Sequence, residues 1–171
     1  AALATGWEHI RFIKRLMKRL DKHIARCIDP VPNPIITVKG LGAVVTAGLL
    51  AEIVDVTRFP EHKHLAQYSG VTWVKRSSGN FVSQNTRLTK AGSKYLRYYL
   101  IMGANTLRQF NLEYKAFYWR KHGEVAKYQH KRALVLTARK LVRLVHALLT
   151  KNVPYVRPRT LANVEEDSSL Q

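Results

Sequence analysis

The sequence has 171 residues, and its 29 Lys and Arg against 11 Asp and Glu give a formal net charge of +18. Hydrophobic residues make up 46% of the chain, which is enough for a core and excludes a wholly disordered polypeptide. The positive charge predicts a polyanionic partner, with nucleic acid favoured over an anionic membrane surface. Because no apolar run approaches the length of a transmembrane helix, we expect no membrane span.

Cysteine usage and the first residues indicate the setting of the chain. Cys27 is the only cysteine, which excludes an internal disulfide and favours a reducing cytoplasm. The start lacks the charged segment and apolar core of a secretory signal. The chain opens without Met and in the middle of a helical pattern, so we expect it to be the C-terminal part of a longer protein.

Residues 7–28 predict one amphipathic helix, within an arm that we place at residues 1–29. Apolar residues recur at alternating spacings of three and four, which is the seam of a coiled coil, while Lys and Arg occupy the other faces. The pattern favours an arm that pairs with another helix and so forms a homo-oligomer, over a helix packed on its own domain. The seam consists of Ile10, Ile13, Met17, Leu20, Ile24 and Cys27.

The stretch "DPVPNP" at residues 29–34 breaks the helix, and a domain over residues 30–155 is expected to begin there. Asn33 can cap a short helix with Pro34 at its first position. The following "VKGLGAVVTAGLLAEI" resembles a helix-hairpin-helix, in which Gly40 and Gly42 permit a sharp turn and the next helix offers N–H groups to a phosphate. The alternative is a turn that only packs two helices.

The rest of the domain predicts a mainly α fold. One helix should begin at Pro60 and end at Gly70, and Thr89 should cap the next one. The segment between them, residues 71–86, predicts either a small β-hairpin or an ordered loop. The polar, acidic tail at residues 156–171 is expected to be disordered. The later helices are expected at residues 90–110, 112–122 and 124–151.

Ser77 and Ser78 lie in a basic segment, residues 74–97, that contains no acidic residue. A serine attacks a phosphate only if its proton is removed and the charge on the phosphate is stabilised. Neighbouring cations would neutralise the phosphate oxygens, and Gly79 would allow a close approach. From the residues alone, a solvated basic loop is favoured over a catalytic one. The cations are Lys75, Arg76, Arg87, Lys90, Lys94 and Arg97.

Other catalytic chemistries find little support in the sequence. His62 and His64 lack companion ligands for zinc, and the acidic residues are too scattered for a two-metal nuclease, so no metal site is predicted in this chain. Tyr95, Tyr98 and Tyr99 cluster on one predicted helix, where packing is favoured over a nucleophilic role.

Five blocks in one order resemble a known family: "TVKGLGAVVTAGLLAEIVDVTRF", "LAQYSGV", "SSGN", "RLTKAGSKYLRYYLIMGA" and "KRALVLTARKLVRLVHALL". Together they resemble the C-terminal catalytic domain of the insertion-sequence transposases that pair an N-terminal DEDD domain with a C-terminal serine domain. These enzymes are described as bridge-RNA-guided recombinases. The resemblance extends over residues 35–155, and the preceding helix is similar to the coiled coil between the two domains of the family.

The resemblance implies that the serine before the glycine, Ser78, is the nucleophile, with Ser77 as the second candidate. It implies a phosphoserine link to DNA, strand exchange without ATP, a guide RNA, and a bacterial or archaeal cytoplasmic protein associated with the nucleoid. It also implies phosphate-binding roles for Arg87, Lys90 and Arg97.

Two departures qualify these expectations. The DEDD domain, with the carboxylates that hold Mg²⁺, is absent from this sequence, so the fragment is expected to be inactive alone. The block "VTWVKR" replaces a commoner proline-containing form, which leaves the register of the serine open by about one residue. The alternative function is a non-catalytic helix-hairpin-helix module that binds DNA or RNA.

Overall fold

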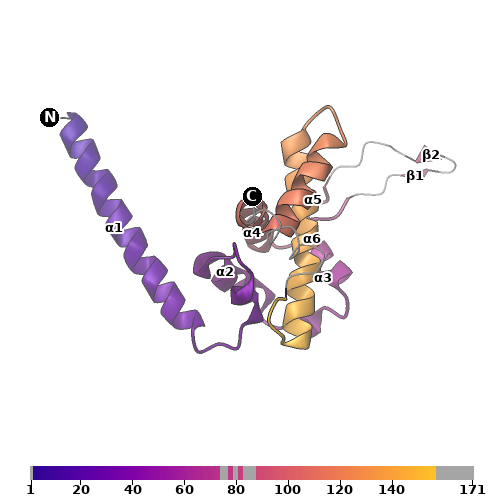
Figure 1. Cartoon of the computed structure of the whole chain (residues 1–171), viewed down its shortest axis with the longest axis horizontal. Coiled ribbons are helices and arrows are strands. Elements are labelled where there is room, and N and C mark those ends of the chain that lie inside the picture. The colour runs from indigo at the N-terminus through magenta and orange to yellow at the C-terminus, as the bar shows by residue number, and fades with distance from the viewer. Residues whose placement is uncertain (1, 74–76, 79–80, 83–87, 157–171) are drawn as a thin grey trace, which may run out of the picture.

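The computed structural model describes residues 2–73, 77–78, 81–82 and 88–156, and it confirms the mainly α fold. Figure 1 shows a helical body, a long helical arm and a short β ladder beyond the body. The elements are α1 (Ala2–Ile28), the 3-10 turn η1 (Pro34–Thr37), α2 (Ala43–Ile53), the 3-10 turn η2 (Val56–Arg58), α3 (His62–Tyr68), β1 (Ser77–Ser78), β2 (Phe81–Val82), α4 (Lys94–Phe110), α5 (Leu112–Gly123) and α6 (Gln129–Lys151).

The core of the body lies between α4 and α6. Leu96, Leu100 and Leu107 recur at helical spacing on α4 and are fully buried. A Cβ atom at Gly103 would lie 3.0 Å from a methyl group of Leu141 on α6, so a small residue permits the close crossing of the two helices. The remaining helices pack around this pair, with α2 against α4 and with α5 against both.

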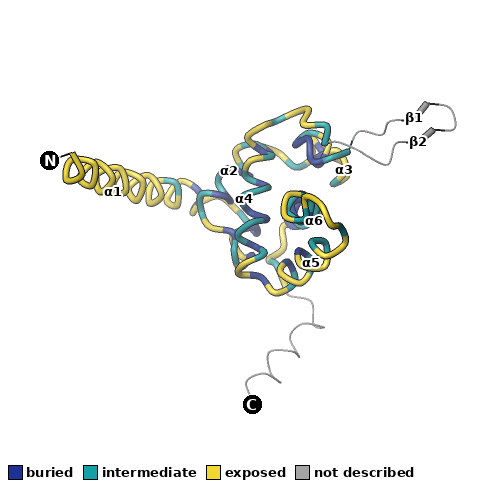
Figure 2. Tube along the Cα trace, turned by 90° about the horizontal axis from the view of Figure 1, so that it is seen from above, coloured by how far each residue is buried: buried dark blue, intermediate teal, exposed yellow. Residues whose placement is uncertain are grey.

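The arm α1 is a single helix, as predicted, although it already begins at Ala2. Figure 2 shows that it is exposed along nearly its whole length, and Ile28 at its end is its one buried residue. Seam residues are open to solvent in the single chain, with 54% exposure at Ile13 and 61% at Leu20. The pairing of this seam with a second helix stays a prediction.

The glycine turn of the predicted helix-hairpin-helix is present, but its first helix is only the 3-10 turn η1. The side chain of Asn33 accepts a hydrogen bond from the Ile35 N–H at 3.1 Å, which confirms the predicted cap. Gly40 has φ +104°, a conformation that favours glycine, and Gly42 caps α2. The first half is short because Val38 takes an extended conformation directly after Thr37.

Three predicted helix starts were wrong. The helix expected to begin at Pro60 begins at His62, because Glu61 is its N-cap, and it ends at Tyr68 and not at Gly70. Ser93, and not Thr89, caps α4, since its Oγ accepts from the Leu96 N–H at 3.0 Å. The residue Lys90 has φ +51° and therefore lies in the turn before the helix. The last helix begins at Gln129 because Tyr128, with φ +56°, is left-handed. Among the helices in the described ranges, none is long and apolar enough to cross a membrane.

Candidate nucleic-acid interface

The serine segment contains a short antiparallel ladder. Ser77 pairs with Val82, and Ser78 pairs with Phe81, so the backbone at these residues forms a hairpin and not an irregular loop. Three predicted phosphate-binding residues, Lys75, Arg76 and Arg87, lie outside the described residues. The predicted disordered tail, apart from its first residue, also lies outside them.

The base of the serine segment is closed by main-chain pairing on the body. Trp73 and Leu88 form an isolated antiparallel bridge. One residue further in, the Thr89 N–H donates to the Thr72 carbonyl oxygen at 2.8 Å, and the two threonine hydroxyls lie 3.1 Å apart. The two chain segments that enter and leave the ladder are therefore held side by side on the surface of the body.

A tight backbone crossing anchors this base to α3 and α4. The Ser93 N–H donates to the Tyr68 carbonyl oxygen at 2.8 Å. Gly92 has φ +91°, and a Cβ atom there would lie 2.0 Å from the same carbonyl oxygen, so the crossing requires glycine. The Ser93 hydroxyl donates to Glu52 on α2 at 2.6 Å, which adds a third helix to the anchor.

Arg97, a predicted phosphate ligand, braces the same turn. Its Nη1 atom donates to the Lys90 carbonyl oxygen at 3.0 Å and to the Ser69 carbonyl oxygen at 3.2 Å. Lys94 lies at the start of α4, with its Nζ atom 4.9 Å from the centre of the Tyr95 ring. Lys90, Lys94 and Arg97 thus share the N-terminal end of α4, beside the ladder base.

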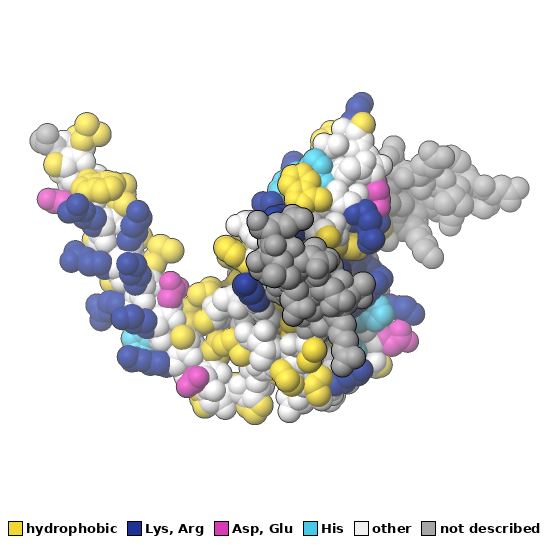
Figure 3. All heavy atoms as spheres, in the orientation of Figure 1, with side chains coloured by type: hydrophobic (Ala, Val, Ile, Leu, Met, Phe, Trp, Pro, Cys, Tyr) yellow, Lys and Arg dark blue, Asp and Glu magenta, His cyan; other side chains and the backbone are white. Residues whose placement is uncertain are grey.

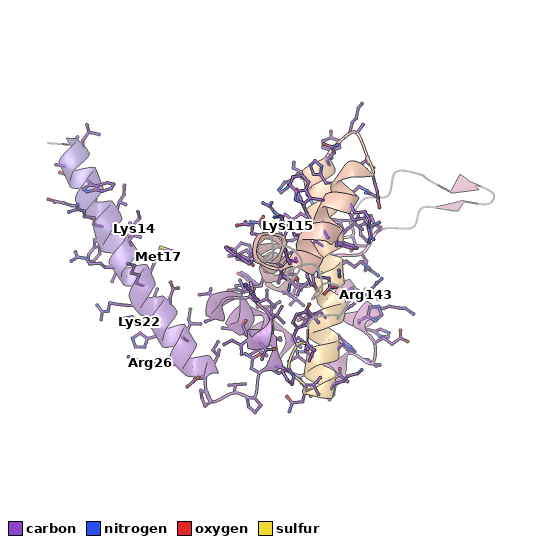
Figure 4. All side chains as sticks on the ribbon, viewed as in Figure 1. Lys14, Met17, Lys22, Arg26, Lys115 and Arg143 are labelled. Atoms are coloured by element: carbon purple, nitrogen blue, oxygen red, sulfur yellow. The ribbon has the colours of Figure 1, made fainter. Side chains whose placement is uncertain are left out.

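A basic cleft of about 490 Å³ lies next to this base, and we call it the ladder cleft. Arg139 on α6 donates through Nη1 to the Val71 carbonyl oxygen at 3.1 Å, and its guanidinium carbon is 5.7 Å from the centre of the Trp73 ring. Arg143, one turn further along α6, is labelled in Figure 4. The cleft is lined by Trp73, Phe117, Arg120, Lys121, Leu136, Arg139, Lys140 and Arg143.

Charge in the ladder cleft is incompletely balanced. Lys140 pairs with Glu113 at 2.6 Å, and Lys121 pairs with Glu124. Among the ion pairs of the described residues, none includes Arg120, Arg139 or Arg143. Burial, together with the nearby Arg143 charge, lowers the pKa of Arg139 from its usual value. Since like charges close together repel, an anion between these guanidinium groups would be stabilised.

The cleft combines guanidinium groups with aromatic rings. Trp73 and Phe117 are half-buried in its wall, and the Arg120 guanidinium carbon lies 5.3 Å from the centre of the Phe117 ring. Arginine forks bind phosphate oxygens in pairs, and exposed aromatic faces stack on bases. The arrangement is typical of a surface that holds a nucleic acid.

The predicted site residues do not all gather in one place. A Cβ atom at Gly40 would lie 3.3 Å from the Leu107 side chain, near the C-terminal end of α4. Arg97 is at the other end, and ten residues of helix separate the two levels by about 15 Å. The glycine turn, with Gly40 and Gly42, is therefore a separate surface from the serine ladder.

Sequence reasoning missed the ladder cleft and misjudged two tyrosines. Arg139 and Arg143 recur at a spacing of four, which suggests a basic helix face but does not indicate that Trp73 packs against it. Tyr99 does pack, with its ring over Gly48, but Tyr95 and Tyr98 are each 57% exposed. The expectation of packing was wrong for these two because they point away from the buried Leu96–Leu100 face.

The basic, aromatic cleft at the ladder base has the chemistry that nucleic-acid-binding proteins use to hold a phosphate backbone. The family model of the IS116/IS110/IS902 transposases matches residues 33–119, which is more than half of the chain. The chain belongs to this transposase family.

Curated relatives agree with the family. The chain is 28% identical over 155 residues to a "Pilin gene-inverting protein" of Moraxella bovis, covering 86% of this chain and 48% of the relative. The protein of the same name from Moraxella lacunata matches with the same identity and coverage. An uncharacterized insertion-element IS110 protein of Streptomyces coelicolor is 26% identical over 150 residues, which cover 86% of this chain and 36% of that protein. The chain thus spans half or less of their length.

Proposed function

We propose that this chain is the serine domain of a DNA transposase or recombinase, and that Ser78 attacks a DNA phosphodiester, with Ser77 as the second candidate. The observation that carries the proposal is the antiparallel ladder containing both serines, whose base adjoins the ladder cleft. The family assignment and the names of the relatives, which include gene inversion, support a role in DNA recombination.

The chemistry is a transfer of the phosphoryl group to serine. The Ser78 Oγ atom forms a bond to phosphorus as its proton passes to a general base, and the bond from phosphorus to the leaving deoxyribose oxygen breaks. That oxygen takes up a proton. Because the phosphoserine link keeps the energy of the phosphodiester, attack by the hydroxyl of another strand rejoins DNA without ATP. Cations on both sides of the phosphate stabilise the charge that develops.

The cations divide between positioning the ladder base and holding phosphates. Arg97 and Arg139 hold main-chain carbonyls at the base, and they act as positioning residues. Arg120 and Arg143 face the cleft without a carboxylate partner among the described residues and are proposed to bind the DNA backbone. Lys75, Arg76, Arg87, Lys90 and Lys94 are proposed to contact the same strand.

Mg²⁺, if the reaction uses it, is proposed to be held by carboxylates outside this sequence. The described residues contain no group of three or more His, Cys, Asp or Glu side chains that could hold a metal ion. We infer that the fragment is inactive alone, that the whole protein uses a guide RNA, and that it acts on DNA in the cytoplasm near the nucleoid.

The test is covalent capture in the whole protein that contains this chain. DNA with a radioactive label should form an adduct that survives denaturing electrophoresis, and Ser78→Ala should abolish it while DNA binding is retained. Ser77→Ala is the matched control and should retain the adduct. If the adduct is lost only in Ser77→Ala, Ser77 is the nucleophile and not Ser78. Adducts in both single variants and in the double variant would overturn serine catalysis.

A second candidate is a non-catalytic module that binds DNA or RNA. The ladder cleft favours it, because the cleft itself needs no serine chemistry to hold a nucleic acid. Here the whole protein would bind nucleic acid with a steep salt dependence, yet yield no adduct under conditions that support recombination.

The arm is proposed to form a homo-oligomer with a second copy of itself. Its seam alternates spacings of three and four over residues 10–27. Ile10, Ile13, Met17 and Leu20 are exposed in the single chain, whereas Ile24 is half-buried in a groove against α2. A second α1 is the occupant that such a seam fits.

A further inference from the structure

The arm carries seven cations on one face, which we call the arm face. All of them are exposed, and Figure 3 shows Lys and Arg side chains along the arm. They form two rows in which residues recur every four positions. With a rotation of about 100° per residue, the seven fall within an arc of about 140°. The rows are Arg11, Arg15 and Arg19, and Lys14, Lys18, Lys22 and Arg26.

The arm face has little negative charge to balance it. Asp21 falls just outside the arc, and Glu8 is the one acidic residue of α1 that falls within it, about one turn before Arg11. Among the ion pairs of the described residues, none includes a cation of the arm face. The seven charges therefore repel one another along a straight helix, and the binding of a polyanion would relieve that repulsion.

The apolar seam lies on the opposite side of the helix. The centres of the two faces are separated by about 160° around the axis. In a helix that lies on a membrane, the apolar face enters the bilayer, and cations at its edges reach the headgroups. The arm face would instead point away from such a membrane. If the seam pairs with another helix, the arm face stays open to solvent.

We propose that the arm face binds the phosphate backbone of a nucleic-acid duplex. From Arg11 to Arg26 the helix rises about 22 Å, a length over which one strand of B-DNA presents about six phosphates. The number and reach of the cations therefore match one strand of a duplex. This surface is separate from the ladder cleft and independent of the serine chemistry, so its failure would leave the proposed function intact.

The test compares two triple variants of the full chain. Lys14→Gln, Lys18→Gln and Lys22→Gln remove three charges from the arm face. Lys115→Gln, Lys127→Gln and Lys131→Gln remove three exposed charges from the body, so both variants lower the net charge of +18 by the same amount. Figure 4 labels Lys14 and Lys22 on the arm and Lys115 on the body. Gln and Lys have similar helix propensities, and circular dichroism checks that α1 is retained.

The probes are fluorescein-labelled DNA and RNA duplexes of one length, titrated over a range of salt concentrations. The arm variant should reduce the slope of log K against log salt by about 2.7 and the affinity roughly 100-fold at about 0.15 M salt. The body variant should change the slope by less than about one unit. Whichever duplex shows the larger loss is the preferred ligand.

Three results would overturn the proposal. An unchanged slope in the arm variant would mean that the arm face makes no phosphate contacts. An equal loss in both triple variants would mean that only net charge matters. A loss of binding to phosphatidylserine vesicles, with duplex binding unchanged, would assign the arm face to membranes instead.

Discussion

Arg139 on α6 donates a hydrogen bond through Nη1 to the main-chain carbonyl oxygen of Val71, at 3.1 Å. It joins the last helix of the body to the segment that leads into the serine ladder. Val71 is fully buried, so its carbonyl oxygen depends on partners within the protein. The position of the ladder base is therefore tied to the position of α6.

Replacing Arg139 by Lys should destabilise the fold although the charge is kept. Lysine has a single ammonium nitrogen and no planar guanidinium group, so it cannot keep both the hydrogen bond to Val71 and the stacking on Trp73. We expect the free energy of unfolding, measured by urea denaturation, to fall by about 1–2 kcal/mol. The matched control is Arg143→Lys, which should leave stability unchanged since Arg143 is exposed. An equal loss of unfolding free energy in both variants would contradict the structural role of the bond between Arg139 and Val71.

Arg97→Ala and Lys94→Ala should separate positioning from phosphate contact. Arg97 holds the Ser69 and Lys90 carbonyl oxygens, so its loss should lower the free energy of unfolding by about 1–2 kcal/mol. Lys94 is exposed at the start of α4, and its loss should weaken DNA binding without a change in stability. Binding titrations and thermal denaturation of both variants check this. If the stability of Arg97→Ala is unchanged, Arg97 does not position the turn, and its predicted role as a direct phosphate ligand is favoured instead.

Two glycine substitutions should have opposite effects. Gly92→Ala would place a Cβ atom 2.0 Å from the Tyr68 carbonyl oxygen in a residue with φ +91°, so we expect a loss of more than about 2 kcal/mol. Gly123→Ala, at the end of α5, meets no atom within 4 Å and should be neutral or stabilise by up to about 1 kcal/mol. Chemical denaturation measures both, and a harmless Gly92→Ala would refute the backbone crossing.

Charge in the seam should dissociate the arm. Ile13→Asp and Ile24→Asp each place a carboxylate on the apolar face, and sedimentation should show a lower mass than for the unsubstituted chain. Lys18→Asp, on the arm face, is the matched control and should leave the mass unchanged. If the mass does not fall in either seam variant, α1 has no helical partner.

Cys27 reports the direction of that pairing. It lies on the seam and is exposed, and it is the only cysteine of the chain. In a parallel, in-register pair the two Cys27 side chains face each other, so mild oxidation should give a covalent dimer on non-reducing electrophoresis. Cys27→Ser should remove the dimer band. A self-associated chain that fails to cross-link would have antiparallel helices.

Helix existence was predictable from the sequence, but some helix boundaries were not. The spacing of Leu96, Leu100 and Leu107 indicates a buried face whatever the surroundings. Thr89 and Ser93 are both acceptable caps on local grounds, although serine is the better cap of the two. The Ser93 N–H bond to Tyr68, a contact between distant segments, fixes the helix start instead.

The ladder cleft could not be predicted for a related reason. Its walls come from Trp73, from Phe117 and Arg120 on α5, and from Arg139 and Arg143 on α6. Each of these segments looks like an ordinary basic surface when it is considered alone. Only the packing of α5 and α6 against the ladder base brings their charges together, and periodicity carries no information about that packing.

The junction between α1 and α2 sets the direction in which the arm extends from the body. Its apolar surfaces meet in a groove lined in part by Ile24, Ile28 and Leu50. Since the 27 residues of α1 extend about 40 Å, a difference of about 10° in the angle between α1 and α2 would displace the far end by about 7 Å. The packing of Ile28 and Leu50 therefore sets the direction of the arm, although neither residue lies near its tip.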